Sequence, residues 1–254
     1  MTHESEPRDP PTTAPTPTSR RLEDSISPLI RVMTVGARAF CRAITRISIE
    51  GALDELPRTG PLIIASNHAS NLDVPVIGSW LIPRLGRRIQ WLGKKELFDW
   101  PVIGWVAANG GVHPVDRGAA DVEAFRLAQR ILDEGHVLFV FPEGTRSPDG
   151  TLQTARDGVA LLALRTGAPI VPLGIAGSHR VWPKGQRLPH PGGHVTVRVG
   201  APFRPAELLP PGTSRSAAKG LTTALIMGRI AALLPPAQRG IHGDARRADG
   251  DPVR

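Results

Sequence analysis

The sequence contains very little cysteine and few aromatic residues. Cys41 is the single cysteine among 254 residues, which excludes an intrachain disulfide and a cysteine-based zinc cluster and fits a reducing compartment. Tyrosine is absent, and aromatic residues make up 4% of the chain. No RNA-binding aromatic motif or zinc-finger pattern occurs either. These absences count against a nucleic-acid-binding module, which stays open only as an alternative suggested by the net charge of +8.

Long hydrophobic runs are also missing. No apolar run reaches the roughly 18 to 20 residues of a membrane-spanning helix, and the amino end lacks the apolar stretch of a signal peptide. We therefore expect no segment that crosses a bilayer. Both ends of the chain are polar and poor in large apolar side chains, which predicts disordered tails over residues 1–22 and 238–254.

Between these tails, short apolar runs alternate with helical patterns. This alternation predicts an α/β domain over residues 48–237, with a mostly parallel sheet flanked by helices and with ligand sites at the carboxyl ends of the strands. We expect strands at 47–51, 61–66, 89–93, 111–115, 136–141, 169–177 and 194–200. Helices are expected after Val74, Pro101, Arg117, Thr154 and Thr213.

Residues 23–47 predict a separate amphipathic helix. Ser27 suits the N-cap and Pro28 suits the first helical position. One interpretation is a helix that lies in a membrane interface, with its arginines on anionic headgroups. The other is a helix that packs on the core and exposes a basic face. The apolar stripe consists of Ile26, Ile30, Met33, Phe40, Ile44 and Ile47, and the opposite side carries Arg31, Arg38, Arg42 and Arg46.

A histidine and an aspartate stand five positions apart in the stretch NHASNLDVP, residues 67–75. On one regular helix, this spacing would place His68 and Asp73 on different faces. Pro75 favours a bend, because proline is tolerated in the first turn of a helix and disfavours helical geometry in the residue before it. We therefore expect a helix to begin at about Val74 or Pro75, with His68 in the preceding loop, where its side chain can meet Asp73.

Charged side chains follow three of the expected strands. Glu143 and Arg146 lie in FPEGTRS, directly after one strand. Lys94 and Lys95 end a second strand, and Arg117 follows a third. Each of these residues alone is typical of a solvated surface. Together, at successive strand ends, the basic residues can converge on one anion.

Four blocks of sequence occur in a fixed order. They read NHASNLD at 67–73, KKELFDWPVIGWVAANGGVHPVDRG at 94–118, FPEGTRS at 141–147 and VPLGIAG at 171–177. With these blocks, the chain resembles the PlsC-like glycerolipid acyltransferases, typified by 1-acyl-glycerol-3-phosphate acyltransferase, from about Ile47 to Phe203. One departure is ARDG at 155–158, where the family usually has an aromatic residue before the basic one.

The resemblance implies the transfer of an acyl group from a thioester to a hydroxyl. His68 would act as the general base, and Asp73 would fix the imidazole tautomer and stabilise the imidazolium. No G-x-S-x-G motif occurs and Cys41 lies away from every block, so no covalent nucleophile is implied. Acyl-CoA or acyl-carrier protein is the implied donor substrate, and neither a cofactor nor a metal is implied.

The resemblance also implies a phosphorylated lipid acceptor of the lysophosphatidic acid type. Basic side chains and backbone amides of the third block would bind its phosphate, and Glu143 would organise the arginines. The partner surface would be an anionic membrane, which the protein would contact peripherally or monotopically at the cytoplasmic face. The residues expected at the acceptor are Lys94, Lys95, Arg117, Glu143, Gly144, Thr145 and Arg146.

Two further alternatives stay open at this point. The acceptor could be another lysolipid or a glycolipid. The pair His68 and Asp73 could also bind a metal, with His113 or Glu143 as a third ligand, in a metallohydrolase.

Overall fold

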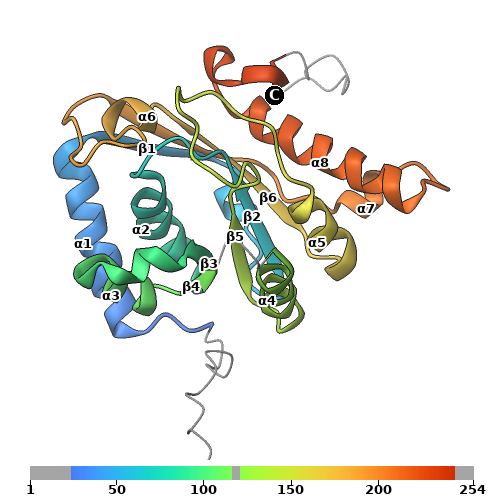
Figure 1. The fold of residues 1–254 in the computed structure, drawn as a ribbon, viewed down its shortest axis with the longest axis horizontal. Coiled ribbons are helices and arrows are strands. Elements are labelled where there is room, and N and C mark those ends of the chain that lie inside the picture. Colours follow the sequence, from blue (N-terminus) through green and yellow to red (C-terminus); the bar gives the residue numbers. More distant parts are fainter. Residues whose placement is uncertain (1–23, 116–120, 244–254) are drawn as a thin grey trace, which may run out of the picture.

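The computed structural model describes residues 24–115 and 121–243, and within them seven strands form one sheet with helices on both faces (Figure 1). The strands occur where the sequence predicts them, and their order across the sheet is β1-β7-β6-β2-β5-β3-β4. Their bounds are β1 Arg46–Gly51, β2 Leu62–Ser66, β3 Ile89–Lys94, β4 Val112–Val115, β5 Val137–Val140, β6 Ile170–Ala176 and β7 His194–Val199.

The sheet is mostly parallel, as predicted. Strands β2 to β6 all run in one direction, whereas β7 is antiparallel to β6 and β1 is parallel to β7. The carboxyl ends of β2, β5, β3 and β4 therefore meet at the same edge, together with the carboxyl end of β6. The first three sequence blocks begin at or directly after the end of a strand at this edge, and the fourth forms most of β6, which brings residues far apart in the chain into one region.

Helices cover the two faces of the sheet separately (Figure 1). One core cluster lies where α1 and α2 pack on the sheet, and the other lies where α4, α5 and α8 pack on it. Strand β2 supplies both cores, because Leu62 and Ile64 point to the first and Ile63 and Ala65 to the second. The helices are α1 Pro28–Ile44, α2 Asp73–Leu85, α3 Pro101–Asn109, α4 Asp121–Asp133, α5 Gly158–Thr166, α6 Ser178–Val181, α7 Pro205–Leu208 and α8 Arg215–Ala232.

Helix α1 begins as the sequence predicts, but its apolar stripe faces the protein. The Ser27 hydroxyl accepts the N–H of Ile30, which is the expected N-cap contact. Ile30 is buried in the core between α1, α2 and the sheet, and Ile26, Ile44 and Ile47 pack against that core. Four of the six stripe residues therefore pack on the protein, as the second interpretation of this helix expects, whereas Phe40 is 42% exposed.

Two of the α1 arginines lie against α2 instead of extending into solvent. The guanidinium carbons of Arg38 and Arg42 lie 5.1 and 5.8 Å from the ring centre of Trp80. Arg38 also donates a 2.5 Å hydrogen bond to the carbonyl of Ser79. These contacts add to the packing of Ile30, Ile26 and Ile44 in holding α1 on the domain.

The ordered part of the domain extends beyond the predicted boundary at residue 238. Two 3-10 turns follow α8, namely η4 (Pro236–Gln238) and η5 (Gly240–His242). The backbone carbonyl of Gln238 accepts the N–H of Leu152, at 2.9 Å. The Gln238 side chain accepts the N–H of Gly177 and donates to the carbonyl of Gly150, at 3.2 and 3.1 Å. The predicted tail over 1–22 and the segment 244–254 lie outside the described residues.

No helix among the described residues is both long and apolar enough to cross a bilayer.

Candidate active site

His68 and Asp73 meet across the bend between β2 and α2. The ring Nδ1 of His68 lies 2.8 Å from Oδ2 of Asp73. Asp73 begins α2, within one residue of the predicted helix start, and its side chain is fully buried. The same Oδ2 accepts the backbone N–H groups of Ala69 and Ser70, both at 2.8 Å. The loop thus wraps around the carboxylate, which fixes its position before any substrate arrives.

The imidazole of His68 is held on its face as well as at Nδ1. It stacks on the ring of Phe141, with 3.8 Å between ring centres and 12° between the planes. Its side chain is 17% exposed, whereas that of Asp73 is inaccessible. Because Nδ1 faces the carboxylate, Nε2 is the ring nitrogen left to exchange a proton with a substrate.

The third block holds the backbone of His68 from both sides. Oε1 of Glu143 accepts the N–H of His68 at 2.6 Å, and the N–H of Ser147 donates to the carbonyl of His68 at 2.7 Å. The second carboxylate oxygen of Glu143 accepts the N–H of Gln153 at 2.9 Å. Glu143 therefore positions the histidine loop through both of its carboxylate oxygens, and its expected role in organising the arginines stays a prediction.

Burial gives the carboxyl of Glu143 an unusually high pKa. Desolvation raises the pKa of its carboxyl to about 7, although the N–H groups of His68 and Gln153 oppose this shift. The nearby charge of Asp73 adds a smaller increase to the pKa. A carboxyl with such a pKa changes its charge near neutral pH while it touches the backbone of His68.

The fourth block meets the first through a buried asparagine. Asn67 donates from Nδ2 to the carbonyl of Ile175 at 2.9 Å and accepts the N–H of the same residue at Oδ1, at 2.7 Å. Pro172 pairs with Ala65 in the ladder between β6 and β2. The block therefore has a structural role here, because it supports the end of β2 immediately before His68.

The described basic residues of the predicted acceptor site fall into two groups. Arg146 lies beside the histidine loop, where its guanidinium donates to Oδ1 of Asn71. Lys94 and Lys95 are exposed at the end of β3. Strand β5 stands between β2 and β3, so the lysines enter this edge about 10 Å to the side of the strand that carries His68. Arg117 lies outside the described residues.

Gly144 and Thr145 form the turn between Glu143 and Arg146. Gly144 has a φ of +68°, and a Cβ there would lie 3.2 Å from Nε of Arg156, so a side chain at this position would be strained and crowded. Arg156 is the basic residue that the chain keeps in ARDG. A tight turn under a guanidinium is compatible with anion binding by backbone amides.

Sequence reasoning missed Lys184, which lies in the loop after α6. Its Nζ donates to the carbonyl of Arg146 at 3.0 Å and to Oγ1 of Thr145 at 3.4 Å. The same loop accepts the N–H of Asn71 and the hydroxyl of Ser70 at the carbonyl of Trp182. The only available signal was a lysine shortly after the fourth block, and spacing alone does not predict that this loop folds back on the first block.

The metal-ligand alternative does not fit the arrangement. The Nε2 of His113 lies 2.9 Å from Oε1 of Gln90, and both carboxylate oxygens of Glu143 accept backbone N–H groups. Across 24–115 and 121–243, no three histidine, cysteine, aspartate or glutamate side chains are grouped to hold a metal ion. Cys41 is buried in α1, and burial raises its thiol pKa to about 12, which makes it a poor nucleophile.

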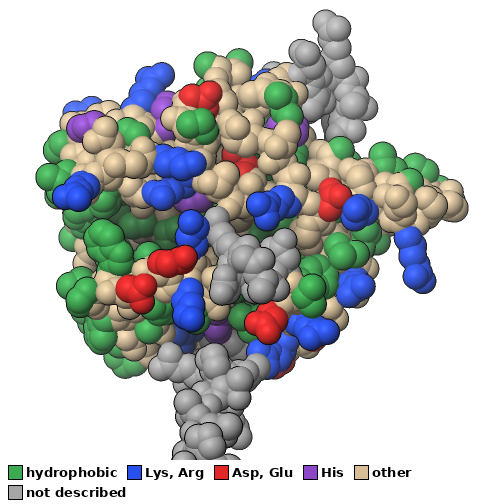
Figure 2. Space-filling model, in the orientation of Figure 1, with side chains coloured by type: hydrophobic (Ala, Val, Ile, Leu, Met, Phe, Trp, Pro, Cys, Tyr) green, Lys and Arg blue, Asp and Glu red, His purple; other side chains and the backbone are tan. Residues whose placement is uncertain are grey.

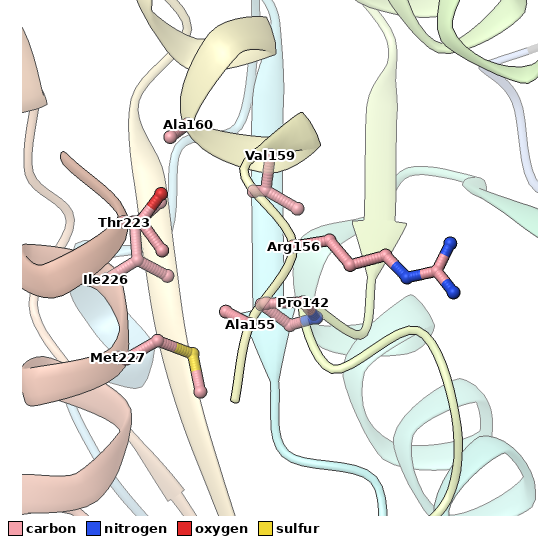
Figure 3. Close-up of a pocket in the computed structure, with 8 residues that line it drawn as sticks. All are labelled: Pro142, Ala155, Arg156, Val159, Ala160, Thr223, Ile226 and Met227. Carbon is pink, nitrogen blue, oxygen red and sulfur yellow. The ribbon is translucent and has the colours of Figure 1, made fainter. Parts of the chain in front are cut away.

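A shallow hollow lies beside Pro142, between the loop after β5 and the helices α5 and α8 (Figure 3). It is lined by Pro142 and by residues of α5 and α8, including Val159 and Met227. Arg156 borders the hollow, but its guanidinium points away from α8, toward the loop after β5 (Figure 3). The hollow is mostly apolar and faces the second core, so it is not where the acid/base chemistry lies.

Comparisons with known proteins agree with this geometry. A family model described as Acyltransferase matches residues 46–176. The chloroplastic 1-acyl-sn-glycerol-3-phosphate acyltransferase of Arabidopsis thaliana is 34% identical over 163 residues, which are 62% of this chain and 44% of the relative. A lyso-ornithine lipid O-acyltransferase of Pseudomonas aeruginosa is 34% identical over 48% of this chain and 45% of the relative. The chain thus spans less than half the length of these curated relatives.

A solved structure extends the comparison to the fold. The crystal structure of the 1-acyl-sn-glycerophosphate acyltransferase PlsC from Thermotoga maritima superposes with a TM-score of 0.63 and 27% sequence identity. The match covers 78% of this chain and 76% of that structure. The shared fold and the family-model match over more than half of the chain show that this protein belongs to the PlsC-like acyltransferase family.

Proposed function

We propose that the protein transfers a fatty acyl group from a thioester to the free hydroxyl of a lysophosphatidic acid-type acceptor. The observation that carries this proposal is the 2.8 Å contact between His68 and the buried Asp73 at the strand edge where the four blocks meet. An imidazole held in this way can take a proton at Nε2, and the carboxylate stabilises the charged ring that results.

The chemistry needs no covalent intermediate on the protein. As Nε2 of His68 takes the hydroxyl proton, the acceptor oxygen attacks the thioester carbonyl and a tetrahedral intermediate forms. Collapse of this intermediate breaks the carbon–sulfur bond and leaves a new ester. The imidazolium then returns its proton to the departing thiolate, so the protein ends in its starting state. Acyl-CoA and acyl-carrier protein both supply such a thioester, and both favour reaction at the cytoplasmic face of a membrane.

The acceptor phosphate is assigned to the basic side of the histidine loop. Arg146 and Lys184 lie within one cluster with Thr145, and they supply charged donors to an anion placed next to His68. Lys94 and Lys95 add positive charge at the same sheet edge, at greater distance. Support for a lysolipid acceptor comes from the names of the relatives, which include acyltransferases for 1-acyl-sn-glycerol-3-phosphate and for lyso-ornithine lipid.

The proposal is tested with purified protein, labelled acyl-CoA or acyl-carrier protein, and a panel of acceptors. The panel contains lysophosphatidic acid, lysophosphatidylcholine, lyso-ornithine lipid and a monoacylglycerol, and the products are identified by mass spectrometry. We expect transfer to lysophosphatidic acid that is lost in His68→Ala. If lyso-ornithine lipid gave more product than lysophosphatidic acid, the assigned acceptor would change and the proposed reaction would stand. No transfer to any acceptor would refute the proposal.

A further inference from the structure

The chain that follows α8 returns to the loop 147–153, which begins at the last residue of the third block. Gln238 ends η4, the first of the two turns after α8. Its backbone carbonyl accepts the N–H of Leu152, a buried residue of this loop, at 2.9 Å. The family-model match ends at residue 176, so this hydrogen bond joins a segment outside the match to a loop inside it.

The side chain of Gln238 joins the same loop to the fourth block. Its Nε2 donates to the carbonyl of Gly150 at 3.1 Å, and its Oε1 accepts the N–H of Gly177 at 3.2 Å. Nε2 also lies 3.3 Å from Nδ1 of His179. A side-chain amide carries donors and an acceptor at one end, so it can bind two backbone segments at once. Gln238 therefore links the loop 147–153 to the end of β6.

The loop 147–153 is tightly folded, so a contact at one of its residues affects the others. Oγ of Ser147 accepts the N–H of Gly150 at 3.0 Å, and Nε2 of Gln153 donates to the same Oγ at 3.4 Å. Gly150 has a φ of +85°, and a Cβ there would lie 2.4 Å from the ring of His179. These close contacts leave the loop little room to change shape, so we expect it to move as one unit.

Both ends of this loop hold the backbone of His68. At one end, the N–H of Ser147 donates to the carbonyl of His68 at 2.7 Å. At the other end, the N–H of Gln153 donates to Glu143, whose second carboxylate oxygen accepts the N–H of His68. The turn η5 supports this second end, because Nε2 of His242 lies 3.3 Å from the carbonyl of Gln153. A displacement of the loop is therefore passed to the peptide groups on both sides of the histidine.

The contacts of Gln238 differ in kind from those assigned to the acceptor phosphate. Figure 2 shows Lys and Arg side chains spread over the face of the molecule that Figure 1 presents, and the phosphate is assigned to two such residues, Arg146 and Lys184. Gln238 instead binds backbone groups and an imidazole. Desolvation lowers the pKa of His179, which favours the neutral ring that can accept a hydrogen bond from an amide. Loss of the Gln238 contacts is therefore expected to disturb the base without removing a charged contact to the acceptor.

We propose that Gln238 is a positioning residue that acts on His68 through the loop 147–153. It holds the backbone of the histidine where Nε2 of the imidazole can reach the acceptor hydroxyl. Misplacement of a reacting group by about 1 Å can cost about 10²-fold in rate, so a loosened loop is enough to slow proton transfer. The inference rests on the proposed function, because it assigns a further residue to the same reaction.

The first experiment separates positioning from stability in the full chain. Gln238→Met keeps the length of the side chain but loses both amide contacts. The matched control is Ile241→Gln in η5, because Ile241 is 72% exposed. We expect Gln238→Met to lower kcat by about tenfold and to change the acceptor KM by less than about twofold, whereas the control changes neither. Circular dichroism shows that the variants are folded at the assay temperature. A folded Gln238→Met variant with the wild-type kcat would overturn the proposal, and so would a rise in KM without a fall in kcat.

A second arm tests the route through Glu143. Two substitutions that act on His68 through the same loop have overlapping effects, so their free energies do not add. We expect Gln238→Met to lower kcat by a smaller factor in the Glu143→Gln background than in the wild type. The milder variant Gln238→Asn, which withdraws the amide by one methylene, should show the same dependence on background. Equal factors in the two backgrounds would overturn the proposal.

A third measurement needs no substrate. The Cε1–H signal of His68 is observed by NMR in protein with isotope-labelled histidine, and it is assigned by its loss in His68→Ala. Neither glutamine nor methionine has an aromatic ring, so a changed signal in Gln238→Met reports a displaced imidazole. We expect this change in Gln238→Met and none in Ile241→Gln, and an unchanged His68 signal in Gln238→Met would overturn the proposal. If the wild type transfers no acyl group, the proposed function fails, whereas this signal still decides whether Gln238 positions His68.

Discussion

The two halves of the candidate site are built in opposite ways. In the loop from Asn67 to Asp73, side chains and backbone are held by hydrogen bonds to β6, to the third block and to the loop after α6. The two lysines at the end of β3 are instead exposed. The contrast teaches that this fold fixes the groups that move a proton and leaves charged groups at its rim, where they can adapt to a substrate.

The largest expected effect comes from removing the base in the rigid half. We expect His68→Ala to lower turnover by about 10² to 10⁴-fold, which is the range for a lost general base. The variant should remain folded, because the imidazole is partly exposed and its main packing contact is the ring of Phe141. Circular dichroism and thermal unfolding provide the control. Turnover close to that of the wild type in the folded variant would remove His68 from the mechanism.

A slightly smaller effect is expected from Asp73→Asn. The amide oxygen can still accept the N–H groups of Ala69 and Ser70, so the loop keeps its shape. The neutral amide no longer stabilises the imidazolium, and we expect turnover to fall by at least about 10²-fold. Steady-state kinetics with thermal unfolding in parallel test this. If activity and stability fell together in proportion, the carboxylate would be a structural group only.

Glu143→Gln tests whether the hydrogen bonds that the Glu143 carboxylate accepts from His68 and Gln153 depend on its charge. Since burial raises the Glu143 pKa from 4.5 to about 7, the unfolded carboxyl ionises at a lower pH than the folded one. The stability contribution of Glu143 is therefore complete below pH 4.5 and is lost as pH rises to about 7, a change on the order of 3 kcal/mol.

The measurement is urea unfolding of wild type and Glu143→Gln at pH 5 and pH 8. The glutamine has one amide oxygen for two backbone donors, so the variant should be less stable at both pH values. Its deficit relative to the wild type should be larger at pH 5 than at pH 8. An identical deficit at both pH values would show that the carboxyl does not titrate in this range.

At the border between the two halves, Arg146→Ala should impair acceptor binding. A charge-assisted contact contributes roughly 1.5 to 3 kcal/mol, which corresponds to about a 10 to 100-fold rise in the acceptor KM. The decisive comparison is between a phosphorylated acceptor and the matching monoacylglycerol. If both acceptors are affected equally, Arg146 supports the loop through Asn71 and does not read the phosphate.

The smallest effect is expected at the exposed rim. Lys94→Gln with Lys95→Gln should raise the KM for an acceptor in anionic vesicles by only a few-fold, because exposed charges interact weakly and are screened by salt. The difference from the wild type should vanish at high ionic strength. A loss as large as that of Arg146→Ala would show that the lysines contact the substrate directly.

Local patterns were sufficient to predict every strand and the bend between His68 and Asp73. Alternating apolar runs and a proline act over a few residues, and these signals are visible in a single sequence. What was missed depends on contacts between distant residues. Asn67 binds Ile175 across 108 positions, and Lys184 reaches Arg146 from a loop that follows a different strand. The helical wheel of α1 showed an apolar stripe correctly, but no pattern within that segment could say whether protein or lipid covers it.

The pairing of β1 also sets an order of events during synthesis. Within the sheet, β1 neighbours only β7, and the paired residues Ser48 and Thr196 are 148 positions apart. A growing chain therefore emerges with β1 unable to join the sheet until β7 has been made. Such long-range pairing slows folding and leaves an unpaired strand exposed in the meantime. Strand β1, the first of the described strands to be made, is thus among the last of them to be secured, and its edge stays open to wrong pairing in the meantime.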